Sequence, residues 1–297
     1  MAVFKSARAK KINYRIGHFF LWPFVILLVT QPFLQPYVDH WRCGRIASEL
    51  EQQYGLVVRY GDPSEFYVPP LNAQINKPSE GIYIGRADEH SALNALKGIQ
   101  AALRKYPMDL LREYLKAVFV SGKITIHGVA GGGTYRYKWI YIAALDEFKQ
   151  NSPALYEQSF HHELSSLYFN GAKFPSIRWL LANEPGFNYL PNQKDVVRAA
   201  SPENRRDPNE ASSWYRAGFV HDYGMASMEN DFNMYAELAM THPEELQKLA
   251  DQYPRIQAKT RILVDFYSSL APELAEYMAS AGLTKTPGST QAHQERQ

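Results

Sequence analysis

The residues whose types and spacing are best suited to catalysis or metal binding lie in the segment 159–169, SFHHELSSLYF. Its apolar spacing predicts a helix, and on a helix positions i and i+4 project from one face, about one turn apart. His162, Glu163 and Ser166 therefore reproduce most of a His-Glu-x-x-His pattern. In that pattern two imidazoles bind one zinc ion, and the glutamate acts as general base on the metal-bound water. Ser166 stands at the second histidine position, where it is a poor zinc ligand.

His161 does not simply replace the missing histidine, because adjacent residues lie roughly 100° apart around a helix. With His162 as the matched ligand and Glu163 as the matched base, catalytic zinc would still need about two further protein ligands and an open position for water. An ordinary helix that carries two histidines and a glutamate without any metal remains the alternative interpretation.

Three further segments accompany this helix in the chain. They are residues 49–60 (ELEQQYGLVVRY), 105–121 (KYPMDLLREYLKAVFVS) and 218–237 (GFVHDYGMASMENDFNMYAE). Together with the glycine-rich turn, the strand after it and the His-Glu helix, they resemble a bacterial family of zinc-binding metallopeptidases. These proteins are zincins related to the catalytic domain of anthrax lethal factor. The resemblance covers residues 45–245 in round numbers and implies a zincin-type α+β fold.

The resemblance also implies roles for residues in the last segment. Tyr223 matches a tyrosine that can stabilise the oxyanion of the reaction. The third metal ligand of the family, a glutamate, falls at Asn230, so the chain departs from the pattern there as well as at Ser166. We expect Asp231, and after it Glu237, to replace the missing ligand. Glu229, His221 and His161 are further candidates, and solvated or helix-capping roles for these carboxylates remain the alternative.

The order of the remaining elements predicts how such a site would be positioned. Strands dominate the first half and helices the second, which indicates one α+β domain over residues 40–283, with a small mixed sheet and a mainly helical half. We predict a flexible turn at 128–133 and one long strand at 134–143, and we expect a polar loop at 185–207. The strand at 134–143 could hold an extended peptide by main-chain hydrogen bonds, or could serve only in sheet packing.

The amino-terminal segment predicts the compartment. Residues 1–18 carry five basic residues and no acidic one, and residues 19–30 (FFLWPFVILLVT) are apolar apart from the last. A basic leader before an apolar run is typical of export, so we interpret 19–38 as an uncleaved signal anchor or a cleaved signal peptide. We expect a single-pass protein of the bacterial inner membrane, with its domain in the periplasm or outside the cell. Residues 284–297 are polar and predicted to be disordered.

Composition excludes other classes of protein. The 297 residues carry a formal net charge of only +2, and several basic residues lie in the leader, so no nucleic-acid-binding surface is expected. Cys43 is the single cysteine, which rules out an internal disulfide and a cysteine-based zinc site. The oligomeric state is not indicated by the sequence.

Two functions follow as expectations. The first is a zinc metallopeptidase-like hydrolase that acts on peptides or proteins, with Glu163 activating water, Tyr223 stabilising the oxyanion, and His162 binding zinc with help from an acidic residue. The second is a catalytically inactive protein of the same fold, used for binding or structure in the cell envelope.

Overall fold

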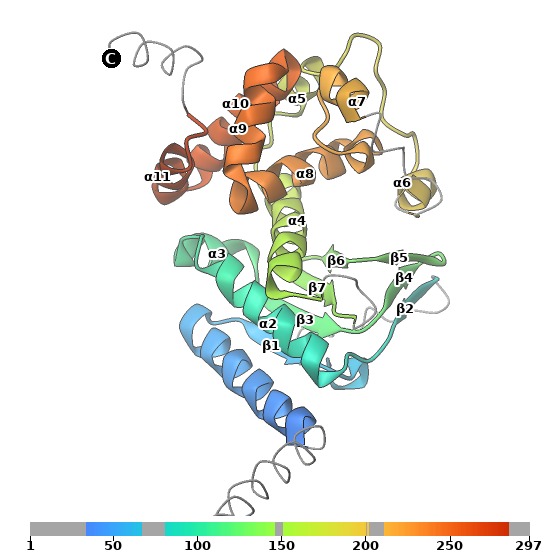
Figure 1. The fold of residues 1–297 in the computed structure, drawn as a ribbon, viewed down its shortest axis with the longest axis vertical. Coiled ribbons are helices and arrows are strands. Elements are labelled where there is room, and N and C mark those ends of the chain that lie inside the picture. Colours follow the sequence, from blue (N-terminus) through green and yellow to red (C-terminus); the bar gives the residue numbers. More distant parts are fainter. Residues whose placement is uncertain (1–33, 67–80, 146–150, 200, 202–210, 285–297) are drawn as a thin grey trace, which may run out of the picture.

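The computed structural model describes residues 34–66, 81–145, 151–199, 201 and 211–284. Figure 1 shows two halves stacked along the long axis, a lower one that contains the strands and an upper one made of helices. A helix over residues 34–54 leads into the lower half. The expected α+β architecture, with strands before helices, is confirmed.

The lower half contains two small sheets. The first has the order β1-β3-β7-β6, and its strands β1 (Val57–Tyr60), β3 (Ala117–Ser121) and β7 (Trp139–Ala143) are parallel. The fourth strand, β6 (Gly133–Arg136), pairs antiparallel with β7 and forms one edge. The second sheet is antiparallel and consists of β2 (Ile82–Ile84), β4 (Ile124–Ile126) and β5 (Val129–Gly131). The small mixed sheet expected from the sequence is thus present.

The predicted long strand at 134–143 was wrong, because the chain turns back between β6 and β7. Tyr137 has a φ of 57°, a left-handed conformation that bulky residues seldom adopt. The turn contains neither Gly nor Asn, the residues that usually indicate one. The alternating aromatic residues on both sides of it have the spacing of a single continuous strand. The predicted turn at 128–133 was also wrong in part, since β5 and the first residue of β6 lie within it.

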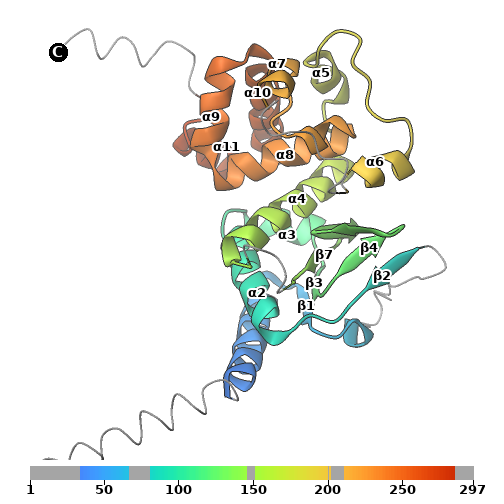
Figure 2. The same cartoon turned by 45° about the vertical axis from the view of Figure 1, so that its right-hand side comes forward.

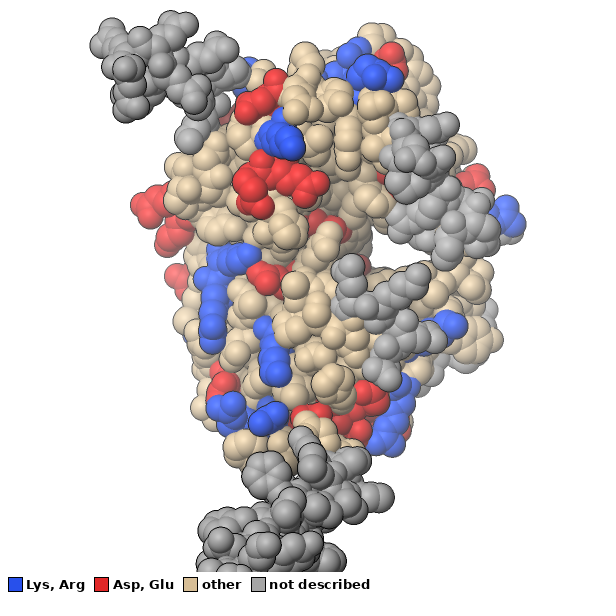
Figure 3. All heavy atoms as spheres, viewed as in Figure 1, with Lys and Arg blue, Asp and Glu red and all other residues tan. Residues whose placement is uncertain are grey.

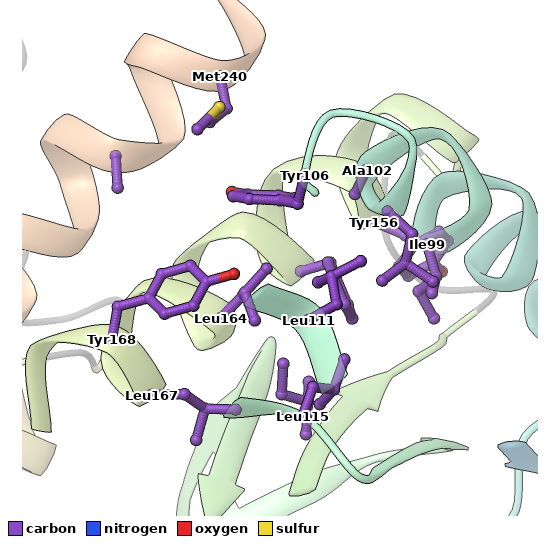
Figure 4. Packing of buried hydrophobic residues seen from close by; sticks show 14 of the residues in the cluster. Ile99, Ala102, Tyr106, Leu111, Leu115, Tyr156, Leu164, Leu167, Tyr168 and Met240 are labelled. Carbon is purple, nitrogen blue, oxygen red and sulfur yellow. The ribbon is translucent and has the colours of Figure 1, made fainter. Parts of the chain in front are cut away.

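The long helix α4 (Pro153–Gly171) joins the two halves, and Figure 2 shows it beside the sheets from a second direction. It packs closely on α2 (Glu89–Leu103) at Gly98, where a Cβ atom would lie 2.3 Å from the Pro153 carbonyl oxygen. In Figure 4 the side chains of Tyr106, Leu164 and Tyr168 lie between Met240 and the strands below. One apolar core therefore holds α4 against elements of both halves.

The upper half is formed by the elements that follow α4 and, within the described ranges, contains more helices than the sequence predicted. The expected polar loop at 185–207 contains the short helix α6 (Gln193–Ala199), and three helices instead of two follow residue 243. The remaining elements are α3 (Met108–Tyr114) and η1 (Pro63–Phe66) below, and α5 (Ser176–Leu181), α7 (Ala211–Ala217), η5 (Asp222–Met225), α8 (Met228–Thr241), α9 (Pro243–Gln252), α10 (Pro254–Leu270) and α11 (Pro272–Ser280) above.

The predicted basic leader and most of the predicted anchor, residues 1–33, lie outside the described residues, as does all but the first residue of the predicted tail at 284–297. Within the described ranges, no helix is both long enough and apolar enough to cross a bilayer.

Candidate functional site

A cleft opens between the two halves at the middle of α4. Its volume is about 340 Å³. One wall is the backbone of residues 130–133, which runs from β5 into β6, and the opposite side is formed by α4, α8 and η5. In Figure 3 the surface is hollowed at mid-height between the halves. The predicted residues His162, Glu163, Tyr223 and Glu237 all line this cleft.

His162 is bound to the neighbouring helix α8. Its Nδ1 nitrogen forms a short hydrogen bond with Glu237 Oε1, and Gln158 Nε2 donates to Glu237 Oε2 at 2.8 Å. Burial by itself lowers the pKa of His162, but the hydrogen bond and charge of Glu237 outweigh it and raise that pKa. An imidazole that donates from Nδ1 to a carboxylate keeps only Nε2 for another partner. Glu237 therefore orients His162 and does not share an ion with it through Nδ1.

Glu163 lies against the glycine wall of the cleft. A Cβ atom at Gly133 would be 2.8 Å from Glu163 Oε1, so only glycine leaves room for the carboxyl group. The side chain is 8% exposed, and its carboxylate accepts no hydrogen bond from any part of the chain that the structure describes. Burial raises the pKa of Glu163 to about 7; the charge of His162 opposes this rise, and Glu229 and Glu237 add to it.

Tyr223 completes the upper side of the cleft from η5. Its ring is nearly parallel to the His162 ring, with an interplanar angle of 18° and a centroid distance of 6.3 Å. His221 also lines the cleft, and its Nδ1 nitrogen lies 2.9 Å from Asp222 Oδ1. Tyr223, which the resemblance singled out, thus lies beside the His-Glu helix, and its role in catalysis stays a prediction.

Two other predicted ligands lie away from the cleft. His161 is fully buried on a different side of α4, where the Tyr106 hydroxyl is 2.8 Å from its Nδ1 and Glu157 is 3.7 Å from its Nε2. Asp231, our first choice for the missing ligand, is fully buried and forms an ion pair with Lys259 at 2.5 Å. The second choice, Glu237, is the carboxylate that meets His162.

The position of the missing second histidine is closed by hydrogen bonds between α4 and α8. Ser166 Oγ accepts from Asn233 Nδ2 at 2.7 Å, and Ser165 Oγ donates to Asn233 Oδ1 at 2.6 Å. Asn230 is buried in the first turn of α8, where its backbone N–H donates to the Ser227 side chain at 3.1 Å. Asn233, Gln158 and Gly133 were missed from the sequence. The spacing of Asn233 and Glu237, four residues apart on one helix face, was the signal available.

These side chains do not fit a zinc centre of the zincin type. Such a centre needs three protein ligands and an open position. Within the described ranges, no group of three His, Cys, Asp or Glu side chains is arranged to hold a metal ion. The Ser166 hydroxyl, at the second ligand position, is already paired with an amide. We therefore derive no chemistry through zinc at this site.

The likeness to known proteins lies in the fold. A solved structure described as that of "a putative zinc-binding metallo-peptidase from Bacteroides caccae" matches the chain with a TM-score of 0.51 and 15% sequence identity. The match covers 82% of this chain and 94% of that chain. No family model and no curated protein matches the sequence. A likeness at this identity establishes a shared fold and nothing more, so the activity must be argued from the residues of the cleft.

Proposed function

We propose that this chain is a binding protein with a metallopeptidase-like fold, which holds an extended peptide in its cleft and does not hydrolyse it. The observation that carries this proposal is the hydrogen-bonded group of Ser165, Ser166 and Asn233. It joins α4 to α8 at the position where a zincin needs its second histidine. The cleft beside this group is retained, so binding can persist where the ligand set for zinc is incomplete.

The walls of the cleft suit an extended peptide. β6 is an edge strand of its sheet, and residues 131–133 at its start line the cavity. An edge strand presents backbone N–H and C=O groups with which another strand can pair. A cavity of about 340 Å³ is at the lower end of the range for small-ligand sites, which suits one side chain of such a peptide.

A size series at Gly132 tests the binding function. A Cβ atom there would lie 3.7 Å from Ser159 Oγ, inside the cleft. Equilibrium dialysis against a library of blocked pentapeptides, read by mass spectrometry, measures retention by the full chain. We expect wild type to retain peptides and Gly132→Ala to retain slightly fewer. Gly132→Leu should weaken retention at least about tenfold, which corresponds to about 1.4 kcal/mol of binding free energy, while its melting temperature stays unchanged. Equal retention by all three chains would contradict the proposal.

Metal-dependent hydrolysis is the competing function, and one observation favours it. A carboxyl group with a pKa of about 7 suits a general acid or base at neutral pH. The same dialysis samples decide between the two functions. We expect intact peptides after incubation with or without added zinc chloride. Zinc-dependent cleavage that disappears in Glu163→Gln would establish a hydrolase and overturn the binding proposal.

We also propose that the chain is attached to a membrane through its amino-terminal segment, as a single-pass protein of the bacterial inner membrane with this domain outside the cytoplasm. Support comes from an exposed apolar stripe at the start of the helix over 34–54. Tyr37 and Trp41 are 77% and 65% exposed, and Leu34 and Val38 complete the same face. This stripe begins four residues after the apolar run at 19–30 ends, and Tyr and Trp favour the interface between lipid and water.

Cysteine labelling of the full chain in lipid vesicles tests this attachment. Tyr37→Cys is expected to react with a polar maleimide at least about tenfold more slowly in vesicles than in detergent-free denaturant, because headgroups cover the stripe. Gln52→Cys, which is exposed farther along the same helix, is the matched control and should react at similar rates. The native Cys43 is buried with its pKa raised to about 12 in the folded chain, but denaturant exposes it, so both variants also carry Cys43→Ala. Equal protection of both sites would contradict the proposal.

A further inference from the structure

The cleft has an excess of negative charge at its floor. Glu163 and Glu237 line it, and Glu229 lies close enough to raise the pKa of Glu163. No Lys or Arg is among the residues that line the cavity. His162 is hydrogen bonded to Glu237, and its single charge also acts on Glu163. Within the described structure, Glu163 is therefore left without a hydrogen-bonded or salt-bridged cation.

Glu163 also lacks the donors that a buried carboxylate needs. More than nine-tenths of the side chain is removed from solvent, and its oxygens face the cavity without a hydrogen bond from any described residue. A buried charge without partners is strongly unfavourable, and buried polar groups in native proteins are nearly always hydrogen bonded. Gly133 prevents the carboxyl group from moving back into the sheet, because the wall already touches it. The donor is therefore supplied from the cleft, by water or by a ligand that displaces it.

We propose that the cleft is a subsite for a Lys or Arg side chain of the bound peptide, whose cationic group donates hydrogen bonds to Glu163. The inference rests on the proposed peptide-binding function and names the chemistry that the cleft selects. Tyr223, Met234 and Leu155 line the same cavity and offer apolar surface for the methylene stem of such a side chain. A charged hydrogen bond at a buried carboxylate is stronger than a neutral one, so the subsite contributes selectivity.

An organic cation fits this floor better than a metal ion. Within the described ranges, no three His, Cys, Asp or Glu side chains converge to hold a metal. A Lys ammonium brings three donors and an Arg guanidinium five, and either can bind a single carboxylate while backbone groups of the peptide pair with the wall. The cavity is also far larger than a bare ion, since its volume is about 340 Å³.

Matched blocked pentapeptides test the subsite on the full chain. We use acetyl-Ala-Ala-X-Ala-Ala-amide with X as lysine, arginine or the neutral isostere norleucine, and measure dissociation constants by fluorescence competition. We expect the lysine and arginine peptides to bind at least about tenfold more tightly than the norleucine peptide. Glu163→Gln should bring the three constants within about twofold of one another. Equal affinity of all three peptides for wild type would overturn the subsite while peptide binding itself stands.

A second probe separates the subsite from the peptide-binding function. n-Butylammonium carries the end of a lysine side chain and has no peptide backbone. We expect it to bind wild type in the millimolar range, by chemical-shift perturbation, and to bind Glu163→Gln at least about fivefold more weakly. If no pentapeptide binds but n-butylammonium does, only the peptide function fails. If n-butylammonium does not bind, or binds both chains alike, the subsite is overturned. A melting scan of Glu163→Gln confirms that the variant is folded.

Discussion

Two buried carboxylates, Asp231 in α8 and Glu163 in α4, show how this molecule separates structure from function. Asp231 Oδ2 accepts from Lys259 Nζ at 2.5 Å, from Trp179 Nε1 at 2.8 Å and from the Tyr189 hydroxyl at 2.7 Å. Glu163 is almost as deeply buried, but no described residue donates to its carboxylate. Partners from distant segments stabilise Asp231, whereas Glu163 faces an open cleft. The difference indicates that Asp231 stabilises the fold, whereas Glu163 is available to bind a ligand in the cleft.

The largest expected effect is the loss of stability when the ion pair of Asp231 is broken. Lys259→Met leaves Asp231 as an unpaired buried charge and is expected to lower the free energy of unfolding by about 3–5 kcal/mol. Urea unfolding measures the change. The double variant Lys259→Met with Asp231→Leu should recover most of the loss, because it removes both charges together. A single variant as stable as wild type would mean that the ion pair does not hold the helices.

Removing the charge of Glu163 is expected to have the opposite effect and to raise the stability of the fold. The pKa of Glu163 is about 7 in the folded chain and about 4.5 when unfolded, so the folded state binds more protons between these values. Stability must therefore fall as pH rises from about 4.5 to about 7, and the whole penalty is present above pH 7. Glu163→Gln removes it and should raise the free energy of unfolding at pH 8 by at most about 3.5 kcal/mol, at about 1.4 kcal/mol per pKa unit.

Below pH 4 the same variant should have the stability of wild type, since the carboxyl group is protonated in both states. Urea unfolding of both chains at pH 4, 6 and 8 gives the profile. A variant that is less stable than wild type at pH 8 would show that Glu163 has internal partners and would remove the contrast with Asp231.

The smallest effect concerns the polar group that stands in place of the second zinc ligand. Asn233→Ala removes two hydrogen bonds to buried serines and is expected to cost about 2 kcal/mol of unfolding free energy. Asn170→Ala removes hydrogen bonds to the Tyr135 hydroxyl and to the Ser166 backbone carbonyl at an exposed position and is the control, with an expected cost below about 0.5 kcal/mol. Equal costs in thermal unfolding would contradict a structural role for Asn233.

Much of this site was visible in the sequence. Helical spacing and the His-Glu pair located α4, and the family resemblance singled out Tyr223, so part of the lining of the cleft was anticipated. The general α+β order was also predictable, because strand and helix periodicities differ. Local patterns of this kind depend only on neighbours in the chain.

The choice between Asp231 and Glu237 could not be made in the same way. It depends on how α8 is rotated against α4, which is set by the burial of Phe232 and Tyr235 in the core. The partner of Asp231, Lys259, is supplied by α10, 28 residues away along the chain. The β6–β7 turn was missed for a related reason, since the left-handed Tyr137 is imposed by sheet pairing against its own preference.

Titration of the chelator-treated full chain with zinc chloride tests the central claim most directly, because it asks whether the cleft can form a metal centre. Calorimetry on wild type and on His162→Ala provides the measurement. We predict no stoichiometric high-affinity site in either chain, since His162 is paired with Glu237 and Ser166 with Asn233. One tightly bound zinc ion per wild-type chain, lost in His162→Ala, would contradict the account.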